Sequence, residues 1–186
     1  MKKQIKVTLI VIVVAIIAAA IIWYVMYLRG KEQDLLTPVG TRAEFIGDTD
    51  KYPTMLTAKG TQILNADGEQ VVLKGVMVPE SRSLYEEKKF NEDFYKDVFA
   101  KGGNAIRVPI SPVEYKNDDY YMWRYLDRIV TWAGENDNYV IFDWDYTGNP
   151  IDGSGDEMPD LDENPLDYSA EFWKNIADYF KNTPNV

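Results

Sequence analysis

The spacing of apolar residues changes twice along the chain. Residues 7–28 form one uncharged, almost wholly apolar run. Residues 30–55 show no sustained period and contain prolines, glycines and charges. From residue 56 onward, short apolar runs alternate with segments whose apolar residues recur every three or four positions, which is typical of strands and amphipathic helices. We therefore predict an N-terminal segment over residues 1–29, a tether over residues 30–55 and a folded domain over residues 56–186.

The folded domain begins with a predicted β-hairpin. Two short apolar segments flank Asn65-Ala66-Asp67-Gly68, and Asn, Asp and Gly tolerate the positive φ that hairpin turns need. The second segment, residues 71–78, is nearly continuous in Val, Leu and Met, so we predict a buried strand there.

Strands and helices alternate after the hairpin. Residues 104–110 and 139–145 are short apolar runs that predict buried strands, and Val186 predicts the first residue of another. Amphipathic helices are predicted for residues 92–101, 118–136 and 172–180. Alternation of this kind indicates a parallel sheet with helices packed on its outside.

Two architectures satisfy this order, an open doubly wound sheet and a (β/α)8 (TIM) barrel. A doubly wound nucleotide-binding fold has a glycine-rich turn after its first strand. The corresponding turn here, residues 76–83, contains no glycine, which favours the barrel. A complete barrel has about 250 residues. We therefore predict an α/β fold in the form of a truncated TIM barrel, made of the N-terminal hairpin and the first three βα units and preceded by a transmembrane helix.

The predicted transmembrane helix is the apolar run of residues 7–28, which is long enough to cross about 30 Å of hydrocarbon. Three lysines precede the run, and aromatic residues near its end suit a membrane–water interface. We predict a single-pass membrane anchor with the folded domain on the extracellular side. The competing interpretation is a signal peptide cleaved near Ala18-Ala19-Ala20, which would leave a secreted protein.

The part of the chain beyond the predicted anchor is strongly acidic. Residues 1–29 hold four of the 20 Lys and Arg residues and none of the 30 Asp and Glu residues, so the remainder carries 16 positive and 30 negative charges, a net charge of −14. Such a surface repels phosphate backbones, which argues against a nucleic-acid partner. The chain also lacks cysteine and histidine. This excludes catalytic triads that need either residue, and it excludes metal sites built from thiolate or imidazole ligands. No cofactor is predicted.

Four segments in order carry a resemblance to a known family: GTQILNADGEQVVLKGVMVPE, GGNAIRVPISPVEY, YVIFDWDYTGN and AEFWKNIADYFKNTPNV. Together they resemble glycoside hydrolase family 5, the cellulase-type retaining glycosidases. The first segment resembles that family's opening hairpin and first barrel strand. GGNAIRVPISPVEY resembles its second strand, YVIFDWDYTGN its third strand, and AEFWKNIADYFKNTPNV the helix that leads to its fourth. The resemblance covers residues 56–186 and implies hydrolysis of a β-linked polysaccharide such as glucan or mannan.

The resemblance also implies where the catalytic residues lie. Retaining glycosidases use two carboxyl groups about 5 Å apart, one as acid/base and one as nucleophile. In this family the acid/base glutamate belongs to an Asn-Glu-Pro at the end of the fourth strand, and the nucleophile lies near the end of the seventh. Both positions would follow Val186, so no residue of this chain is assigned as catalytic. We therefore expect a fragment of a membrane-anchored hydrolase that is inactive by itself.

Four residues are predicted to contact a polysaccharide or oligosaccharide substrate. Arg107 matches the family arginine that supports the nucleophile and the sugar pocket. The alternative is a barrel-core or surface arginine, because a charged residue in a buried strand needs a partner. Asp145 stands where the family usually has histidine, so an anion replaces a neutral imidazole. Tyr146 matches an aromatic residue of the same loop, and Glu80 lies at the strand-end rim by position only. Asp143 and Asp145 face the same way, but the resemblance assigns catalysis elsewhere.

Alternatives remain for the acidic loop and for the whole domain. Oxygen-bearing side chains in the loop fall at calcium-loop spacing, at Asp152, Ser154, Asp156, Asp160 and Glu163. Because Glu157 replaces the glycine that such a loop requires, we predict a solvated loop and no metal site. The alternative functions are a non-catalytic carbohydrate-binding or scaffold protein on a degenerate half-barrel, and a membrane-tethered interaction module without a sugar role.

Overall fold

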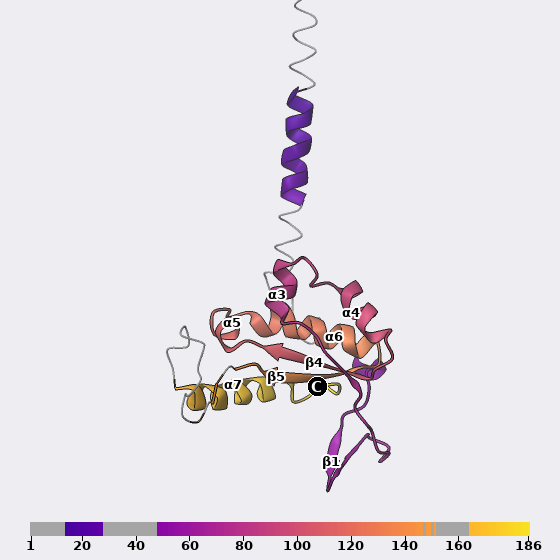
Figure 1. Cartoon of the computed structure of the whole chain (residues 1–186). Coiled ribbons are helices and arrows are strands. Elements are labelled where there is room, and N and C mark those ends of the chain that lie inside the picture. Colours follow the sequence, from indigo (N-terminus) through magenta and orange to yellow (C-terminus); the bar gives the residue numbers. More distant parts are fainter. Residues whose placement is uncertain (1–13, 28–47, 147, 150, 152–163) are drawn as a thin grey trace, which may run out of the picture. The chain divides into compact units, whose positions relative to one another are not determined.

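The computed structural model describes residues 14–27, 48–146, 148–149, 151 and 164–186. The chain divides into two compact units, Met1–Val39 and Gly40–Val186. The second unit contains a parallel three-stranded sheet in the order β3-β4-β5, and Figure 1 shows how helices surround it. The strands of this sheet are β3 (Gly75–Met77), β4 (Ala105–Ile110) and β5 (Tyr139–Trp144). The helices of the unit are η1 (Thr49–Lys51), α3 (Ser81–Glu86), α4 (Glu92–Phe99), α5 (Pro112–Lys116), η2 (Met122–Leu126), α6 (Asp127–Glu135) and α7 (Pro165–Phe180).

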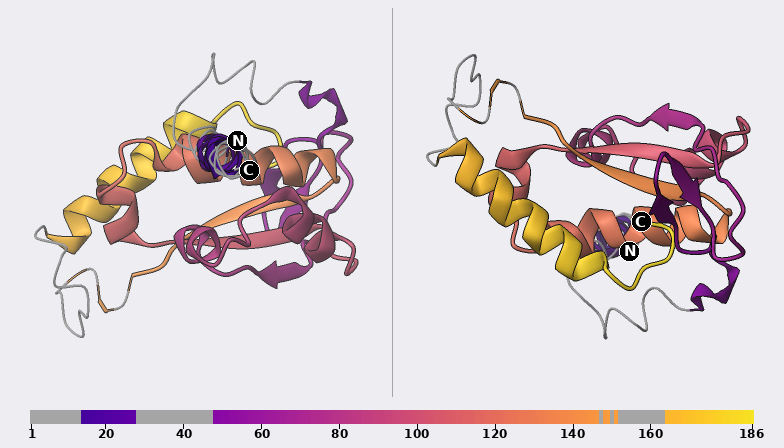
Figure 2. Two further views of the ribbon diagram at one scale, coloured as in Figure 1. Left: turned by 90° about the horizontal axis from the view of Figure 1, so that it is seen from above. Right: turned by 90° about the horizontal axis from the view of Figure 1, so that it is seen from below.

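The two faces of the sheet differ in burial. On one face, Ile106, Val108 and Ile110 of β4 are at most 1% exposed, because helices cover them. The rings of Phe142 and Trp144 on this face pack against α7, and Figure 2 shows α6 and α7 on the same side of the strands. The opposite face is called the open face below. There a single row across the sheet, Met77, Arg107 and Ile141, lies in register and is exposed.

An aromatic cluster forms the core between the helices. The ring of Phe90 lies 6.0 Å from that of Tyr95, 5.2 Å from that of Tyr125 and 5.4 Å from that of Trp132. These edge-on and tilted arrangements are the favoured geometries for aromatic pairs. The cluster joins α4 to the helix formed by η2 and α6, and thereby orients the helices that position the ends of the strands.

The predicted hairpin is present, together with a second turn that the sequence analysis missed. The Asn65 Oδ1 atom accepts hydrogen bonds from the amides of Asp67 and Glu69, and Gly68 adopts φ +80°, which confirms the predicted turn. The regular pair of strands precedes this turn in the chain. β1 (Thr57–Lys59) pairs antiparallel with β2 (Gln62–Leu64) around a turn at Gly60, where φ is +62°.

The strands predicted at residues 104–110 and 139–145 are confirmed by β4 and β5 within one residue at each end. The strand predicted at residues 71–78 is wrong in length, because only Gly75–Met77 pairs with β4. The preceding residues continue the hairpin instead, where the Val71 amide donates to the Ile63 carbonyl.

The predicted helices are also present. Asn91 caps α4 as expected, with its side-chain oxygen accepting from the Phe94 amide at 3.0 Å. The helix predicted at residues 118–136 begins with a π-helical segment, η2, before it continues as α6. The helix predicted over residues 172–180 starts earlier, at Pro165, because the Asn164 side chain caps it there.

The N-terminal unit is described only in part. Residues 14–27 are helical. Residues 7–13 and 28 of the predicted membrane span lie outside the described residues. No helix built from the described residues is both long enough and apolar enough to cross a bilayer.

The end of the predicted tether packs on the folded domain. Residues 30–47 lie outside the described residues, but η1 is formed and Tyr52 is buried. A Cβ atom at Gly134 would lie 2.4 Å from the Tyr52 ring, so this glycine is what lets the tyrosine lie against α6. The Tyr139 hydroxyl also donates to the Thr54 carbonyl at 2.8 Å, which fastens this segment to the start of β5.

The predicted α/β class with a parallel, helix-covered sheet is confirmed, whereas the described residues form no closed barrel. No fourth strand pairs with this sheet among the described residues. The Val140 amide donates to the Asn185 carbonyl at 2.7 Å, on the edge of β5 that faces away from β4. Val186, the residue predicted to start that strand, directly follows this contact.

Candidate active site

An ion pair lies on the open face of the sheet near the carboxyl ends of the strands. The Arg107 Nη2 atom lies 2.7 Å from the Asp143 Oδ2 atom. Arg107 lies in the middle of β4, opposite Ile141 of β5, and Asp143 lies two residues after Ile141. The Arg107 side chain is 53% exposed, so it is not a core arginine, and the ionic partner that it has is also what the alternative of a surface arginine requires. Solvent reduces the stabilisation from such an exposed pair to about 1 kcal/mol or less. Its main effect is therefore to hold the guanidinium in one orientation.

Asp145 lies just beyond the end of β5 and is exposed. Its amide donates to the Ile110 carbonyl at 3.1 Å, so the backbone is still held by β4 at this point. The carboxylate thus reaches the carboxyl end of the sheet, the end at which barrel enzymes build their sites. The ion pair brings Arg107 and Asp143 together on the open face, and the alternation of side chains along β5 predicts that Asp145 lies on that face as well.

Glu80 has two structural contacts. One carboxylate oxygen accepts from the Ser83 amide at 2.9 Å and caps α3, and the other accepts from the Tyr121 hydroxyl at 2.7 Å. Burial, together with the nearby Glu80 carboxylate, raises the pKa of Tyr121 well above its usual value, so this phenol stays a donor. Both oxygens of Glu80 are therefore engaged in holding α3 and η2 together. Tyr121 could not be predicted as a partner of Glu80, because a contact across 41 residues leaves no local signal in the sequence.

The loop after β5 begins with aromatic residues. Trp144 points to the helix-covered face, where its ring lies 4.5 Å from Phe172 and 5.4 Å from Tyr168 of α7. Tyr146 is half-buried, and its ring lies 6.4 Å from that of Trp144. The Trp144 ring therefore packs near one side of Tyr146 at the end of the sheet, which is the position predicted from the sequence. Whether it contacts a sugar stays a prediction.

In the described part of the chain, no group of three or more acidic side chains is placed to hold a metal ion. The residues of the calcium-loop alternative, 152–163, lie outside the described residues.

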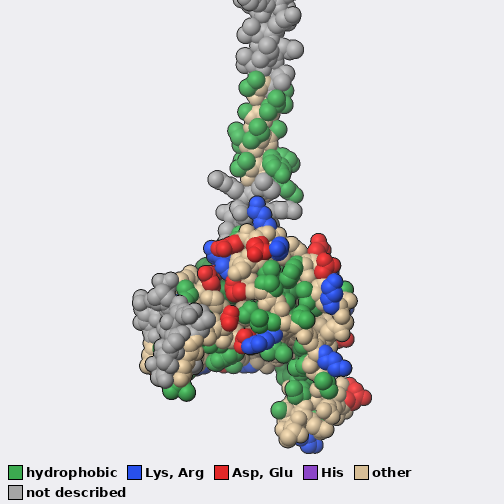
Figure 3. Space-filling view, viewed as in Figure 1, with side chains coloured by type: hydrophobic (Ala, Val, Ile, Leu, Met, Phe, Trp, Pro, Cys, Tyr) green, Lys and Arg blue, Asp and Glu red, His purple; other side chains and the backbone are tan. Residues whose placement is uncertain are grey.

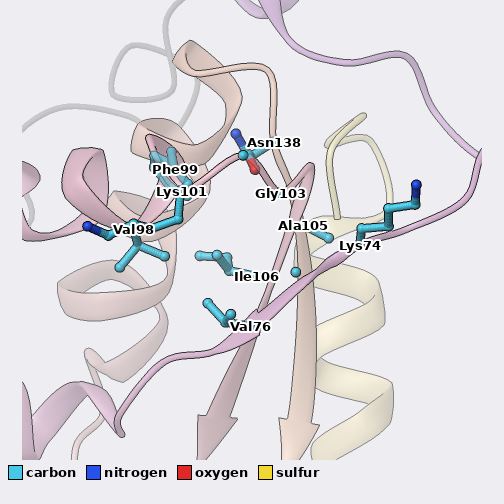
Figure 4. Close-up of a pocket in the computed structure, with 11 residues that line it drawn as sticks. Lys74, Val76, Val98, Phe99, Lys101, Gly103, Ala105, Ile106 and Asn138 are labelled. Carbon is cyan, nitrogen blue, oxygen red and sulfur yellow. The ribbon is translucent and has the colours of Figure 1, made fainter.

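The opposite end of the sheet holds an apolar cavity of about 230 Å³ between β3 and the C-terminal end of α4. Figure 4 shows Val76, Val98 and Ile106 facing this cavity, while the Lys74 side chain extends away from it. Because the polar groups do not converge, the cavity has no arrangement for chemistry. Acidic side chains on the face shown in Figure 3 are likewise spread over several elements with basic residues between them, as expected of a solvated surface.

Comparison with known proteins gives one family match. The family model Cellulase (glycosyl hydrolase family 5) matches residues 64–186. Endoglucanase A from Butyrivibrio fibrisolvens is 27% identical over 152 residues, which cover 73% of this chain and 31% of that protein.

Two solved structures have a similar fold. A β-glucanase from Saccharophagus degradans, in complex with cellotetraose, has a TM-score of 0.66 at 22% identity, over 81% of this chain and 44% of that chain. Cellulase Cel5C_n has a TM-score of 0.54 at 23% identity, over 75% of this chain and 43% of that chain. The chain thus spans less than half the length of each of these proteins.

Proposed function

Because the chain belongs to glycosyl hydrolase family 5, we propose that its folded domain is the N-terminal part of a TIM barrel that hydrolyses β-linked polysaccharide such as glucan or mannan. The observation that supports this role is the Arg107–Asp143 ion pair at 2.7 Å on the open face of the sheet. A guanidinium held by one carboxylate keeps further N–H donors for a second carboxylate or for sugar hydroxyls. In a retaining glycosidase, the second carboxylate would be the nucleophile.

In this proposal the chain supplies substrate contacts, and residues equivalent to the later half of the longer relatives supply both catalytic glutamates. Arg107 donates hydrogen bonds, and the exposed Asp145 carboxylate accepts them from sugar hydroxyls. Tyr146 offers a ring edge or face to the sugar. Glu80 contributes less directly, since both of its oxygens are engaged in the protein.

A non-catalytic carbohydrate-binding role is the second candidate. Asp145 favours it, because the family usually has histidine at this position and an exposed carboxylate cannot donate a hydrogen bond in its ionised form. Both candidates require that the strand-end side chains contact sugar, so one binding experiment tests both of them.

We expect the full chain to bind cellotetraose weakly through Arg107. Arg107→Gln should lower the affinity by about tenfold or more, since charge-assisted hydrogen bonds contribute about 1.5–3 kcal/mol. Titration calorimetry with the full chain in detergent measures this change. The matched control is Lys96→Gln, which also removes the cation of an exposed ion pair but lies on α4. No binding by the unmodified chain, or equal losses in both variants, would contradict the proposal.

We also propose that residues 7–28 anchor the protein in a membrane with the folded domain outside the cell. The support is the length and apolarity of this run and the lysines before it. The expected result is that the protein stays with the membrane pellet after a carbonate wash. Recovery of soluble protein whose N-terminus lies near residue 21 would instead identify a cleaved signal peptide.

A further inference from the structure

A small pocket lies among the helices, between α5, the start of η2 and α7. Its volume is about 270 Å³. Figure 2 shows α5 beside α7, and the ring of Tyr115 on α5 lies 5.0 Å from that of Phe172 on α7. Because α5 directly follows β4, the pocket lies toward the carboxyl end of the sheet. It is on the helix-covered side, whereas the Arg107–Asp143 pair, called the strand-end site below, is on the open face.

The pocket is formed on the side of α7 that faces α5 and η2. Tyr168, Glu171 and Asn175 line it and recur at spacings of three and four residues, so they share one side of the helix. Trp173 and Ala177 lie on the opposite side of α7, beside the edge of β5. In a longer barrel the next strand and helix would add at that edge. The pocket is therefore formed by α5, η2 and α7 alone.

Tyrosine rings that are held in place form the apolar part of the pocket. The buried Tyr121 donates its hydroxyl proton to Glu80 at 2.7 Å, and the buried Tyr168 donates to the Pro112 carbonyl at 3.3 Å. The ring of Tyr115 lies 5.9 Å from that of Tyr121. Because these contacts fix the rings before a ligand binds, little conformational freedom remains to be lost on binding. Aromatic surface of this kind suits the C–H face of a sugar ring.

Polar side chains form the rim of the pocket. Glu171 and Asn175 are exposed on α7, and Asp119 is exposed in the turn before η2. An amide both donates and accepts hydrogen bonds, and a carboxylate accepts from two neighbouring hydroxyl groups, which are the groups that a sugar presents. Burial raises the pKa of Tyr115, although the nearby Asn175 side chain lowers it in part, so this phenol keeps its proton as a further donor.

The charges around the pocket nearly cancel. Of its three acidic residues, Asp118 is paired with Arg124, and Lys116 offsets one of the other two. The single negative charge that remains is too little to select a strongly ionic ligand. An uncharged ligand that is rich in hydroxyl groups matches the rim, the aromatic surface and the charge together.

We propose that this pocket is a second carbohydrate site, which binds one unit of a neutral β-linked polysaccharide such as glucan or mannan. The inference rests on the proposed function, because that function is what brings a polysaccharide to the domain. A polymer held here keeps other parts of the same chain near the strand-end site at a raised effective concentration.

A site-resolved NMR titration of the full chain in detergent with cellotetraose tests the proposal. The amide signals of Asp119 and Asn175 report on the pocket, and those of Ile141 and Asp143 report on the strand-end site. We expect both pairs of signals to shift. Arg107→Gln should leave the dissociation constant at the pocket unchanged within about twofold, because sites that share no partners act independently.

The double variant Glu171→Ala with Asn175→Ala removes two polar groups of the rim. We expect it to raise the dissociation constant read from the Asp119 signal by about tenfold or more. The constant read from the Ile141 signal should not change. Both substitutions lie at exposed helical positions, where alanine favours the helix, so the fold is kept.

The matched control is Asp178→Ala with Asn182→Ala, an exposed acid and an exposed asparagine at the same spacing that do not line the pocket. Equal losses in the two double variants, no shift at Asp119, or loss of that shift in Arg107→Gln would overturn the second site. The proposed function would still stand in each case if the Ile141 signal shifts. Shifts at the pocket alone would instead contradict the role proposed for Arg107 and leave the second site supported.

Discussion

Replacing Gly75 with alanine is expected to destabilise the folded domain by more than about 3 kcal/mol, the upper range for overpacking of a core. A Cβ atom at this position would lie 1.7 Å from the carbonyl oxygen of Ala105 on the neighbouring strand. Because that oxygen belongs to the backbone of β4, no side-chain rotation can relieve the contact. β3 and β4 would have to move apart, which would break the pairing between Gly75 and Ala105.

Urea denaturation followed by far-ultraviolet circular dichroism measures this effect. The control is Val76→Ala in the same strand, where the side chain is 54% exposed and the expected loss is below about 1 kcal/mol. A Gly75→Ala protein as stable as the control would mean that β3 and β4 do not approach each other as described.

The second large effect concerns catalysis, where we expect no release of reducing sugar from β-glucan or β-mannan by the chain alone. Asp143 is the acidic residue of β5, and Asp145 directly follows the strand. Asp143 is already bound to Arg107 at 2.7 Å. Asp145 is exposed to water rather than held near an apolar surface. A retaining glycosidase needs two carboxyl groups that flank the scissile bond, one as nucleophile and one as acid/base, and the resemblance places both of them elsewhere.

A reducing-sugar assay over long incubation tests this expectation, with an active family 5 endoglucanase as the positive control. Activity that disappeared in Asp143→Asn or Asp145→Asn would reverse the roles assigned to these residues. Activity that survived both substitutions would point to a contaminating enzyme.

The parts of the fold that could be predicted from the sequence are those determined by local chemistry. β4 and β5 are apolar runs interrupted by one charged residue each, and Asn91 is a helix cap that acts within three residues. The length of β3 could not be predicted, because residues 71–78 have one composition but only the part opposite Ala105–Arg107 finds a partner. The turn at Gly60 was missed for a different reason, since Asn65 to Gly68 gave a stronger turn signal nearby.

The same distinction applies to the candidate site. Arg107 lies in an apolar strand, so the sequence predicts that it needs an ionic partner. Which residue is the partner, Asp143, depends on the register between β4 and β5. The contact of Tyr121 with Glu80 depends on how η2 packs against α3, which no spacing in the sequence encodes. Local chemistry thus predicted which residues were candidates, and tertiary packing decided which contacts they make.

The asparagines that precede the strands have a consequence for biosynthesis. The Asn104 side chain accepts from the Lys74 amide and donates to the Val72 carbonyl, and so holds the start of β3. The buried Asn185 side chain likewise donates to the Asn138 carbonyl at the start of β5. One of the hydrogen bonds at each strand start therefore comes from a residue that is translated 30 or 47 positions later. At roughly 5–20 residues per second, these asparagines follow the strand starts by seconds, so on the ribosome each strand start is made before all of its hydrogen-bond partners exist.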